Sequence, residues 1–288
     1  MNKLPAGGSG VEPLFARVYF HLHLVSDSTG ETLTTLAKAA CAQFDNVVSI
    51  EHAHTLIRHR RQLERVLQDI DDAPGVVLYT LVDPDLQSLL RAHCGQASIP
   101  SLAILDPTLM LLSSYLGATL APLPGRQHEL DARYFDRIEA LNFAMAHDDG
   151  QNLRDLDKAA IVLVGVSRTS KTPTCIYLAN RGYKAANVPL VAGMAPPAEL
   201  DRAKHPLIVG LVASPERLVQ VRRNRLLVMS EARETDYVDA DKVRAETAAA
   251  RRLFEEKRWP VIDISRRSIE ETAAAVINLL SRRASTVT

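Results

Sequence analysis

The segment from Gly165 to Thr172 has the residue types and the spacing of a phosphate-binding loop. Four residues separate Gly165 from Ser170, and Lys171 and Thr172 follow directly. This is the pattern G-x-x-x-x-G-K-[ST] with serine in place of the second glycine. Because serine adopts the backbone angles of that position less readily than glycine, the pattern alone also fits an ordinary strand-to-helix turn with a solvated lysine.

The sequence around this segment favours a nucleotide site. The apolar run "AIVLVG" before it indicates a buried strand, and "TPTCIYLANRG" after it indicates a helix. A helix N-terminus offers unpaired N–H groups and the positive end of a dipole to a phosphate. We expect Lys171 to bind the terminal phosphates, Arg168 to offset charge on a transferred phosphoryl group, and Thr172 to bind Mg²⁺. The residues expected to contact the nucleotide are Gly165, Val166, Ser167, Arg168, Thr169, Ser170, Lys171 and Thr172.

A second candidate is "SDSTGET" at residues 26–32, which also lies between an apolar strand pattern and a helical one. Ser26, Ser28 and Thr29 have hydroxyls that could line an anion pocket, and Asp27 could accept a proton or hold a metal ion. The same residue types cap helices and form turns. From the sequence alone, capping and turn chemistry is the favoured interpretation.

A third candidate is "MAHDDG" at residues 145–150. His147, Asp148 and Asp149 could form a general base or a metal site. They could equally be the polar end of a helix that stops at Gly150. The second interpretation is the simpler one.

Other polar clusters carry a weaker signal. The pairs in "HLH" at 21–23 and "HAH" at 52–54 lie on one face of an extended chain, but neither has a third ligand at a diagnostic spacing, so a metal site is not favoured. The arginines Arg222, Arg223 and Arg225 fit the solvated side of a helix, although arginine also binds phosphate well.

These candidates lie in a chain where strand and helix patterns alternate, which predicts an α/β protein with mostly parallel sheets covered by helices. The polar segment "DDGQNLRDLDKA" is followed by a second series of strand, loop and helix patterns. We therefore expect a domain boundary near residue 150. The predicted domains are residues 1–150, with a flexible tail at about 1–14, and residues 151–288, which carry the nucleotide-binding loop.

The composition excludes several classes of function. The 288 residues contain 34 basic and 34 acidic side chains, so no net charge attracts the protein to nucleic acid or to a membrane surface. The three cysteines are scattered, which argues against a disulfide framework and favours a reducing compartment. No apolar stretch has the length of a signal peptide core or a membrane helix. A cytoplasmic location is therefore expected.

Taken together, the chain resembles the regulatory proteins of pyruvate, phosphate dikinase and phosphoenolpyruvate synthase. The resemblance covers nearly the whole chain, including "SDSTGET", "QHELDARYFDRIEALNFAMAHDDG", "GVSRTSKTPTCIYLANRGYKAANVPLV" and "VIDISRRSIEETAA". It implies that "GVSRTSKT" is the nucleotide loop of a P-loop kinase-like C-terminal domain and that Ser170 is a family trait.

The resemblance also implies a bifunctional enzyme. One activity is a serine/threonine kinase that transfers the β-phosphoryl group of ADP to a threonine beside the catalytic histidine of the dikinase. The other is a phosphorylase that removes this group with inorganic phosphate and releases pyrophosphate. The sequences of these motifs are more similar to those of the regulators of the dikinase than to those of the regulators of the synthase.

Several points stay open. The alternatives are the same chemistry on phosphoenolpyruvate synthase, a small-molecule kinase, or an ADP sensor without catalysis. Mg²⁺ is the metal ion that we expect to accompany ADP. The oligomeric state that we consider is a homodimer. A carboxylate must activate the acceptor hydroxyl or hold the metal, and the candidates are Asp263, Asp148 and, third, Asp27.

Overall fold

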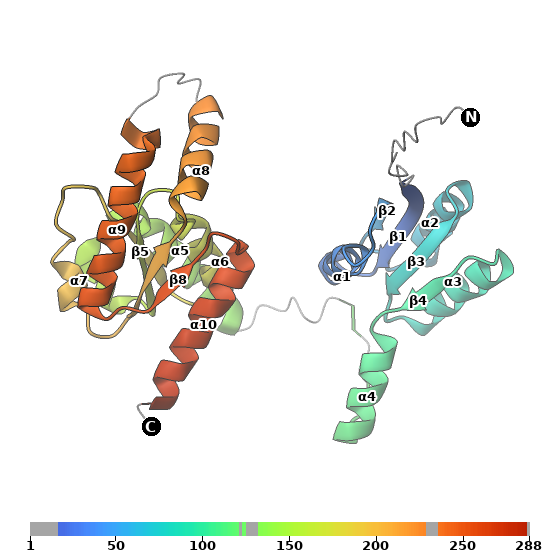
Figure 1. The fold of residues 1–288 in the computed structure, drawn as a ribbon. Helices are drawn as coiled ribbons and strands as arrows, with labels where there is room; N and C mark the ends of the chain where they lie inside the picture. Colours follow the sequence, from blue (N-terminus) through green and yellow to red (C-terminus); the bar gives the residue numbers. More distant parts are fainter. Residues whose placement is uncertain (1–16, 121–122, 125–131, 229–235, 287–288) are drawn as a thin grey trace, which may run out of the picture. The chain divides into compact units, whose positions relative to one another are not determined.

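The computed structural model describes residues 17–120, 123–124, 132–228 and 236–286. Its contacts divide the chain into two compact units, Met1–Glu129 and Leu130–Thr288, which Figure 1 labels by element. Each unit contains one sheet of four strands, and all the strand pairs are parallel. The predicted fold class is therefore confirmed. The predicted tail at 1–14 lies outside the described residues.

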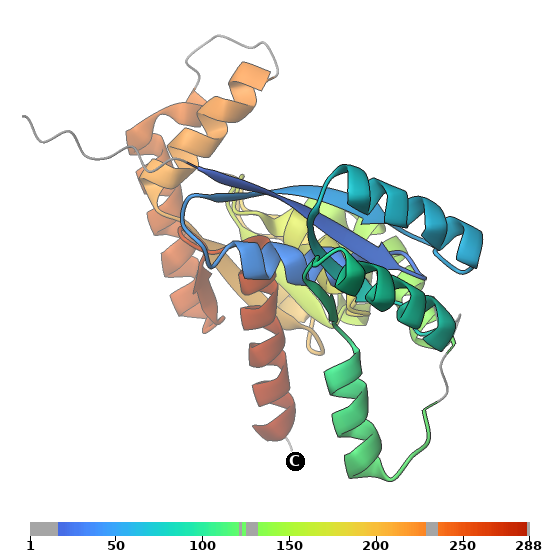
Figure 2. The same cartoon turned by 90° about the vertical axis from the view of Figure 1, so that its right-hand side faces the viewer.

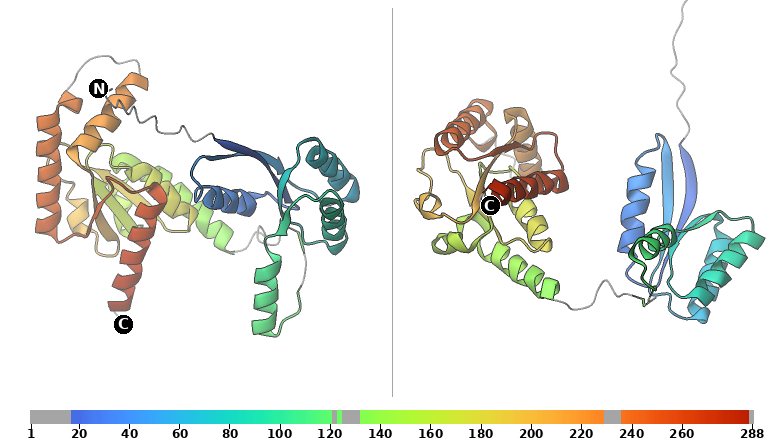
Figure 3. Two further views of the ribbon diagram at one scale, coloured as in Figure 1. Left: turned by 45° about the vertical axis from the view of Figure 1, so that its right-hand side comes forward. Right: turned by 90° about the horizontal axis from the view of Figure 1, so that it is seen from below.

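Unit 1 has the strand order β2-β1-β3-β4. Its elements are β1 Val18–Ser26, α1 Glu31–Cys41, β2 Val47–His54, α2 Arg60–Asp72, β3 Gly75–Thr80, α3 Pro84–Gln96, β4 Ser101–Ala103 and α4 Asp106–Leu116. The alternation of β1 sends Leu22 and Leu24 toward α1, while Val25 packs with α2 and α3 on the opposite face. Figure 3 shows α1 on one side of these strands and α2 and α3 on the other.

Helix α4 differs from the other helices of unit 1. It buries none of its side chains, although it carries large apolar residues such as Met110, Leu111 and Tyr115. Figure 2 shows it extending away from the strands of unit 1.

Unit 2 has the strand order β6-β5-β7-β8. Its strands are β5 Ile161–Gly165, β6 Ala185–Pro189, β7 Leu207–Val212 and β8 Val261–Asp263, and its helices are α5 Ala132–Ala146, α6 Lys171–Asn180, α7 Glu199–Arg202, α8 Pro215–Val228, α9 Ala240–Lys257 and α10 Ile269–Thr286. The described residues of unit 2 also form three short 3₁₀ helices: η2 Asp148–Gly150, η3 Leu153–Lys158 and η4 Asp236–Val238. Every residue of β5 is buried, as expected for a central parallel strand with helices on both faces.

The helices of unit 2 cover both faces of its sheet. Helices α5, α6 and α10 pack on one face and α7, α8 and α9 on the other. Ala140 and Ala144 of α5 lie in the same core cluster as Ile161 of β5 and Leu178 of α6. Helix α5 therefore belongs to unit 2, and the division between the units lies earlier than the expected boundary near residue 150.

None of the helices in the described part of the chain combines the length and the apolarity that a membrane span requires.

Candidate active site

The predicted phosphate loop lies between the central strand β5 and the first turn of α6. Strand β5 ends at Gly165, where a Cβ atom would lie 2.6 Å from the backbone oxygen of Leu211 and 2.7 Å from the Thr169 hydroxyl. Only glycine fits this close approach of two strands and the loop. The Thr169 hydroxyl donates a hydrogen bond of 2.9 Å to the backbone oxygen of Val166 and closes the loop on itself.

The backbone of the loop has two residues in the left-handed region. These are Arg168, with φ 70°, and Ser170, with φ 54° and ψ 25°. Ser170 is the residue immediately before α6, so its conformation sets the direction in which the helix begins. The position is thus one that favours glycine, as the sequence pattern indicated, and serine occupies it in that conformation.

Lys171 is buried beside the loop. Its ammonium group donates a hydrogen bond of 3.0 Å to the backbone oxygen of Val166, and the residue is 6% exposed. Burial lowers the pKa of Lys171 to about 8, although the nearby carboxylates of Asp149 and Asp148 act in the opposite direction. A buried ammonium at a helix N-terminus is suited to bind an anion, because an anion replaces the hydration that burial removes.

Asp148, the first residue of η2, accepts a hydrogen bond of 2.8 Å from the hydroxyl of Thr172 in the first turn of α6. The amide of Asn187, in β6, donates to the same Asp148 oxygen and also contacts the Thr172 hydroxyl at 3.1 Å. The Asn187 side-chain oxygen in turn accepts from the backbone N–H of Asp149 at 3.2 Å. A carboxylate and a hydroxyl beside a phosphate loop are the hard oxygen ligands that Mg²⁺ prefers.

Of the three polar residues in "HDD", His147 does not join the loop. It is buried, its ring stacks on Phe143 with 3.8 Å between centroids, and its Nδ1 bonds the Phe143 backbone oxygen at 2.8 Å. Its Nε2 has no hydrogen-bond partner among the described residues. His147 thus packs at the end of α5, and Asp148 is the member of the cluster that reaches Thr172.

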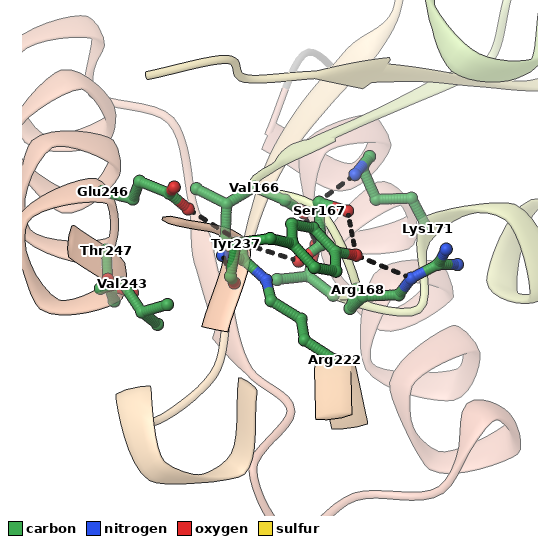
Figure 4. Close-up of polar contacts among 10 residues, drawn as sticks. Val166, Ser167, Arg168, Lys171, Arg222, Tyr237, Val243, Glu246 and Thr247 are labelled. Carbon is green, nitrogen blue, oxygen red and sulfur yellow. Dashed lines mark hydrogen bonds and ion pairs between the residues drawn. The ribbon is translucent and has the colours of Figure 1, made fainter. Parts of the chain in front are cut away.

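Tyr237 joins the other side of the loop to α8 and α9 (Figure 4). Its hydroxyl lies 3.1 Å from the Ser167 hydroxyl and accepts a hydrogen bond of 3.0 Å from Arg168. Its ring lies under the Arg222 guanidinium, with 4.6 Å from Cζ to the ring centroid. Tyr237 therefore fixes the position of the Arg168 side chain.

Arg222 is 1% exposed and is held by three groups. It donates to the backbone oxygens of Tyr237 at 3.0 Å and Ser167 at 3.3 Å, and it pairs with Glu246 at 2.8 Å. These bonds make Arg222 a support of the loop, whereas the neighbouring Arg223 and Arg225 are exposed.

Asp263 lies at the carboxyl ends of the strands, as the loop does, but it belongs to a different strand. It ends β8, which β7 separates from β5. One carboxylate oxygen accepts from the Ser265 backbone and hydroxyl, and the other pairs with Arg251 at 3.2 Å. Burial alone would raise the pKa of Asp263, but Ser265 and Arg251 hold it below its ordinary value. Its contacts are thus local, and Asp148 is the predicted carboxylate that contacts the loop.

In unit 1, the segment "SDSTGET" follows β1 and leads into α1. Asp27 is 4% exposed and accepts a hydrogen bond of 2.7 Å from the Val82 backbone N–H. The Ser26 hydroxyl accepts from the Ser28 N–H at 3.1 Å and from the Thr80 hydroxyl at 3.0 Å. Burial raises the pKa of Asp27. The bond between Ser26 and Ser28 is turn chemistry, whereas the bonds from Thr80 and Val82 connect the segment to the end of β3. An anion-binding role for Ser26, Ser28 and Thr29 stays a prediction.

The two histidine pairs of β1 and β2 bond to each other. His21 Nδ1 lies 2.9 Å from His52 Nε2, and His23 Nδ1 lies 3.1 Å from His54 Nε2. The ring of His23 stacks on both His52 and His54. No group of three or more potential metal ligands gathers in the described residues.

Two residues of this site were not predicted from the sequence, Asn187 and Tyr237. The signal for Asn187 was a polar residue within the buried strand "AANVP". Tyr237 lies 70 residues after Ser167 in the chain, and no local pattern marks it.

The geometry defines a strand-loop-helix site with a buried lysine, a hydroxyl and a carboxylate at the helix N-terminus. In agreement with this, residues 22–277 match the family described as Kinase/pyrophosphorylase. The chain belongs to this family.

Several relatives are similar to this chain over most of its length. A protein of Caulobacter vibrioides named "Putative pyruvate, phosphate dikinase regulatory protein" is 61% identical over 269 residues, which cover 93% of this chain and 85% of that protein. Proteins with the same name from Bradyrhizobium sp. strain ORS 278 and Maricaulis maris are 56% and 53% identical, and each match covers 92% of this chain. The matches cover 95% of the Bradyrhizobium protein and 94% of the Maricaulis protein.

Proposed function

We propose that this protein is a bifunctional regulator of pyruvate, phosphate dikinase, which it phosphorylates on threonine with ADP and dephosphorylates with inorganic phosphate. The observation that carries the proposal is the contact of Asp148 with Thr172 beside the buried Lys171. The family and the names of the relatives support the choice of reaction class and of protein substrate.

In the forward reaction, the threonine oxygen of the dikinase forms a bond to the β-phosphorus of ADP. The bond from that phosphorus to the bridging oxygen breaks, AMP leaves, and the hydroxyl proton is released. The N–H groups at the start of α6 and the Lys171 ammonium bind the phosphoryl oxygens, and Arg168 offsets charge on the transferred group.

Mg²⁺ fits this site, because Thr172 and Asp148 offer two hard oxygen ligands and the nucleotide supplies others. When bound, the cation neutralises charge on the diphosphate. Asn187 donates to the Asp148 carboxylate and contacts the Thr172 hydroxyl, so it orients the carboxylate toward Thr172. We favour Asp148 over Asp263 for the carboxylate role, since Asp263 is held by Ser265 and Arg251.

In the reverse reaction, an oxygen of inorganic phosphate attacks the phosphorus of the phosphothreonine. The bond from phosphorus to the threonine oxygen breaks, the threonine takes up a proton, and pyrophosphate leaves. The transferred phosphoryl group has the same place in both reactions, and the attacking phosphate takes the place of the phosphate of the departing AMP, so one loop serves both reactions.

The test mixes the purified protein with purified dikinase and with ADP labelled on the β-phosphate. It also includes the substrate that phosphorylates the catalytic histidine of the dikinase. We expect labelled phosphothreonine on the dikinase and unlabelled AMP in solution. Transfer to phosphoenolpyruvate synthase alone would move the target to that enzyme. Transfer only to a small molecule, or ADP binding without transfer, would overturn the proposal.

A further inference from the structure

A large cavity lies beside the phosphate loop but does not include the N-terminus of α6, where the phosphates are expected to bind. Its volume is about 790 Å³. It meets the loop at Val166, and its other walls are Tyr237 of η4, the segment after β6 and one side of α9. Lys171, Thr172 and Asp148 are not among its lining residues. An occupant of the cavity would therefore lie next to the phosphates without competing for their ligands.

The walls of the cavity are mainly apolar. Leu190, Val191 and Met194 line one side, and Ala245 and Ala249 line the other. Val191 and Met194 are 56% and 70% exposed, so an occupant would cover apolar surface that is now in contact with solvent. Methionine at the rim adapts its shape to different side chains.

Two of the polar side chains on the walls already have partners. The Tyr237 hydroxyl contacts Ser167 and Arg168, and Glu246 pairs with Arg222. A purine base needs hydrogen bonds to its edge for specific recognition, and these engaged groups are poorly placed to supply them. The other two polar side chains of the walls, Lys242 and Arg252, are donors only and so cannot pair with the exocyclic amino group of adenine. An apolar segment of a protein has no such requirement.

We propose that this cavity, on the basis of the proposed function, receives apolar side chains of the protein substrate next to its acceptor threonine. The diphosphate then lies at the N-terminus of α6, and the protein segment lies against α9. The two substrates meet at Val166 and Ser167. Tyr237 stands at their junction, where it holds Arg168 for the group that is transferred.

The test fills the cavity with Ala245→Leu combined with Ala249→Leu. Both alanines are exposed residues one turn apart on α9, so the larger side chains enter the cavity without disturbing the core. Ala248→Leu is the matched control, because this exposed alanine of α9 does not line the cavity. Met194→Asp at the rim is a second variant that carries little risk to folding.

The readouts are the affinity for immobilised dikinase in the presence of ADP, and the affinity for ADP alone. We expect the filled variant and Met194→Asp to bind dikinase at least about tenfold more weakly, with ADP affinity unchanged and the control like wild type. Unchanged dikinase affinity overturns the proposal. Weaker ADP binding with unchanged dikinase binding also overturns it and assigns the cavity to the nucleoside.

The outcome is separable from that of the proposed function. If wild-type protein binds dikinase through this cavity but transfers no phosphate, the reaction fails and the docking site stands. If transfer occurs and the filled variant keeps its KM for dikinase, the reaction stands and the docking site fails.

Discussion

Individual residues of the loop are in conformations that their side chains do not favour. Ser170 and Arg168 both have positive φ angles, which glycine adopts at little energetic cost. The sequence pattern predicted this at Ser170, because glycine is the usual residue there. It did not predict the angle of Arg168.

The left-handed angle of Ser170 leads to a stability prediction. Ser170→Gly removes the cost of the left-handed backbone, about 1–2 kcal/mol, but the greater entropy of glycine in the unfolded chain costs about 0.5–1 kcal/mol. The free energy of unfolding therefore stays equal or rises by about 1 kcal/mol. Ser170→Val lowers it by about 1–2 kcal/mol, since a β-branched residue is a rare outlier at positive φ. Urea denaturation of both variants measures this difference. A Ser170→Gly variant less stable than Ser170→Val would contradict it.

The burial of Lys171 leads to a pH prediction. Its pKa is lowered to about 8, and only the charged ammonium attracts phosphate, so ADP affinity falls as the pH rises above about 8. Bound phosphate raises this pKa by favouring the charged form, which places the loss of affinity above the pKa of the free protein. Calorimetric titration of ADP across this pH range measures the effect. Lys171→Arg is the control, because arginine stays charged and removes the transition.

At the scale of elements, the sequence patterns located most strands and helices. The run "GVVLYTLV" at residues 75–82 contains β3, and "ARYFDRIEALNFAMAH" contains α5. The apolar run "SLAILD" at residues 101–106 predicts a strand, but β4 covers only Ser101–Ala103, because α4 begins at Asp106 with Pro107 in its first turn. The patterns did not indicate which sheet α5 covers, since the contacts of Ala140 and Ala144 are made to distant parts of the chain.

The pairing of β1 and β2 leads to an acid-sensitivity prediction. Burial lowers the pKa of His23 and of His54 below the ordinary value of 6.5, although the hydrogen bond to the Ala73 backbone opposes this at His23 and Asp69 opposes it at both. The unfolded chain therefore binds more protons, so stability from this cluster is full above about pH 6.5 and is lost as the pH falls below that value. Hydrogen exchange at about pH 5.5, corrected for intrinsic rates, is expected to show faster local opening of β1 and β2 than at pH 7.5. Unchanged protection of these strands would contradict the prediction.

At the scale of the whole molecule, the candidate site is assembled from segments far apart in the chain. Lys171 and Thr172 could be found from the sequence, since their spacing is local. Asp148 was one of three carboxylates that the sequence left open, and its contact with Thr172 favours it. Asn187 and Tyr237 could not be found, because only the fold brings β6 and η4 to the loop.

The central claim is that one loop, at residues 165–172, serves both opposed reactions. The rival is a second phosphate site at "SDSTGET" in unit 1, where Ser28 and Thr29 follow β1. The two hypotheses differ in which variants lose the removal of phosphate. Ser28→Ala and Thr29→Ala would lose it selectively if the second site were real.

The most direct measurement is the rate of both reactions with Lys171→Met. We expect ADP-dependent phosphorylation of dikinase and phosphate-dependent removal both to fall by a factor on the order of 10²–10³. Lys158→Met is the control, because Lys158 is exposed and precedes β5 at the opposite end of the strand, and it is expected to keep both rates. A Lys171→Met protein that removes phosphate at the wild-type rate, while Ser28→Ala does not, would contradict the single-loop account.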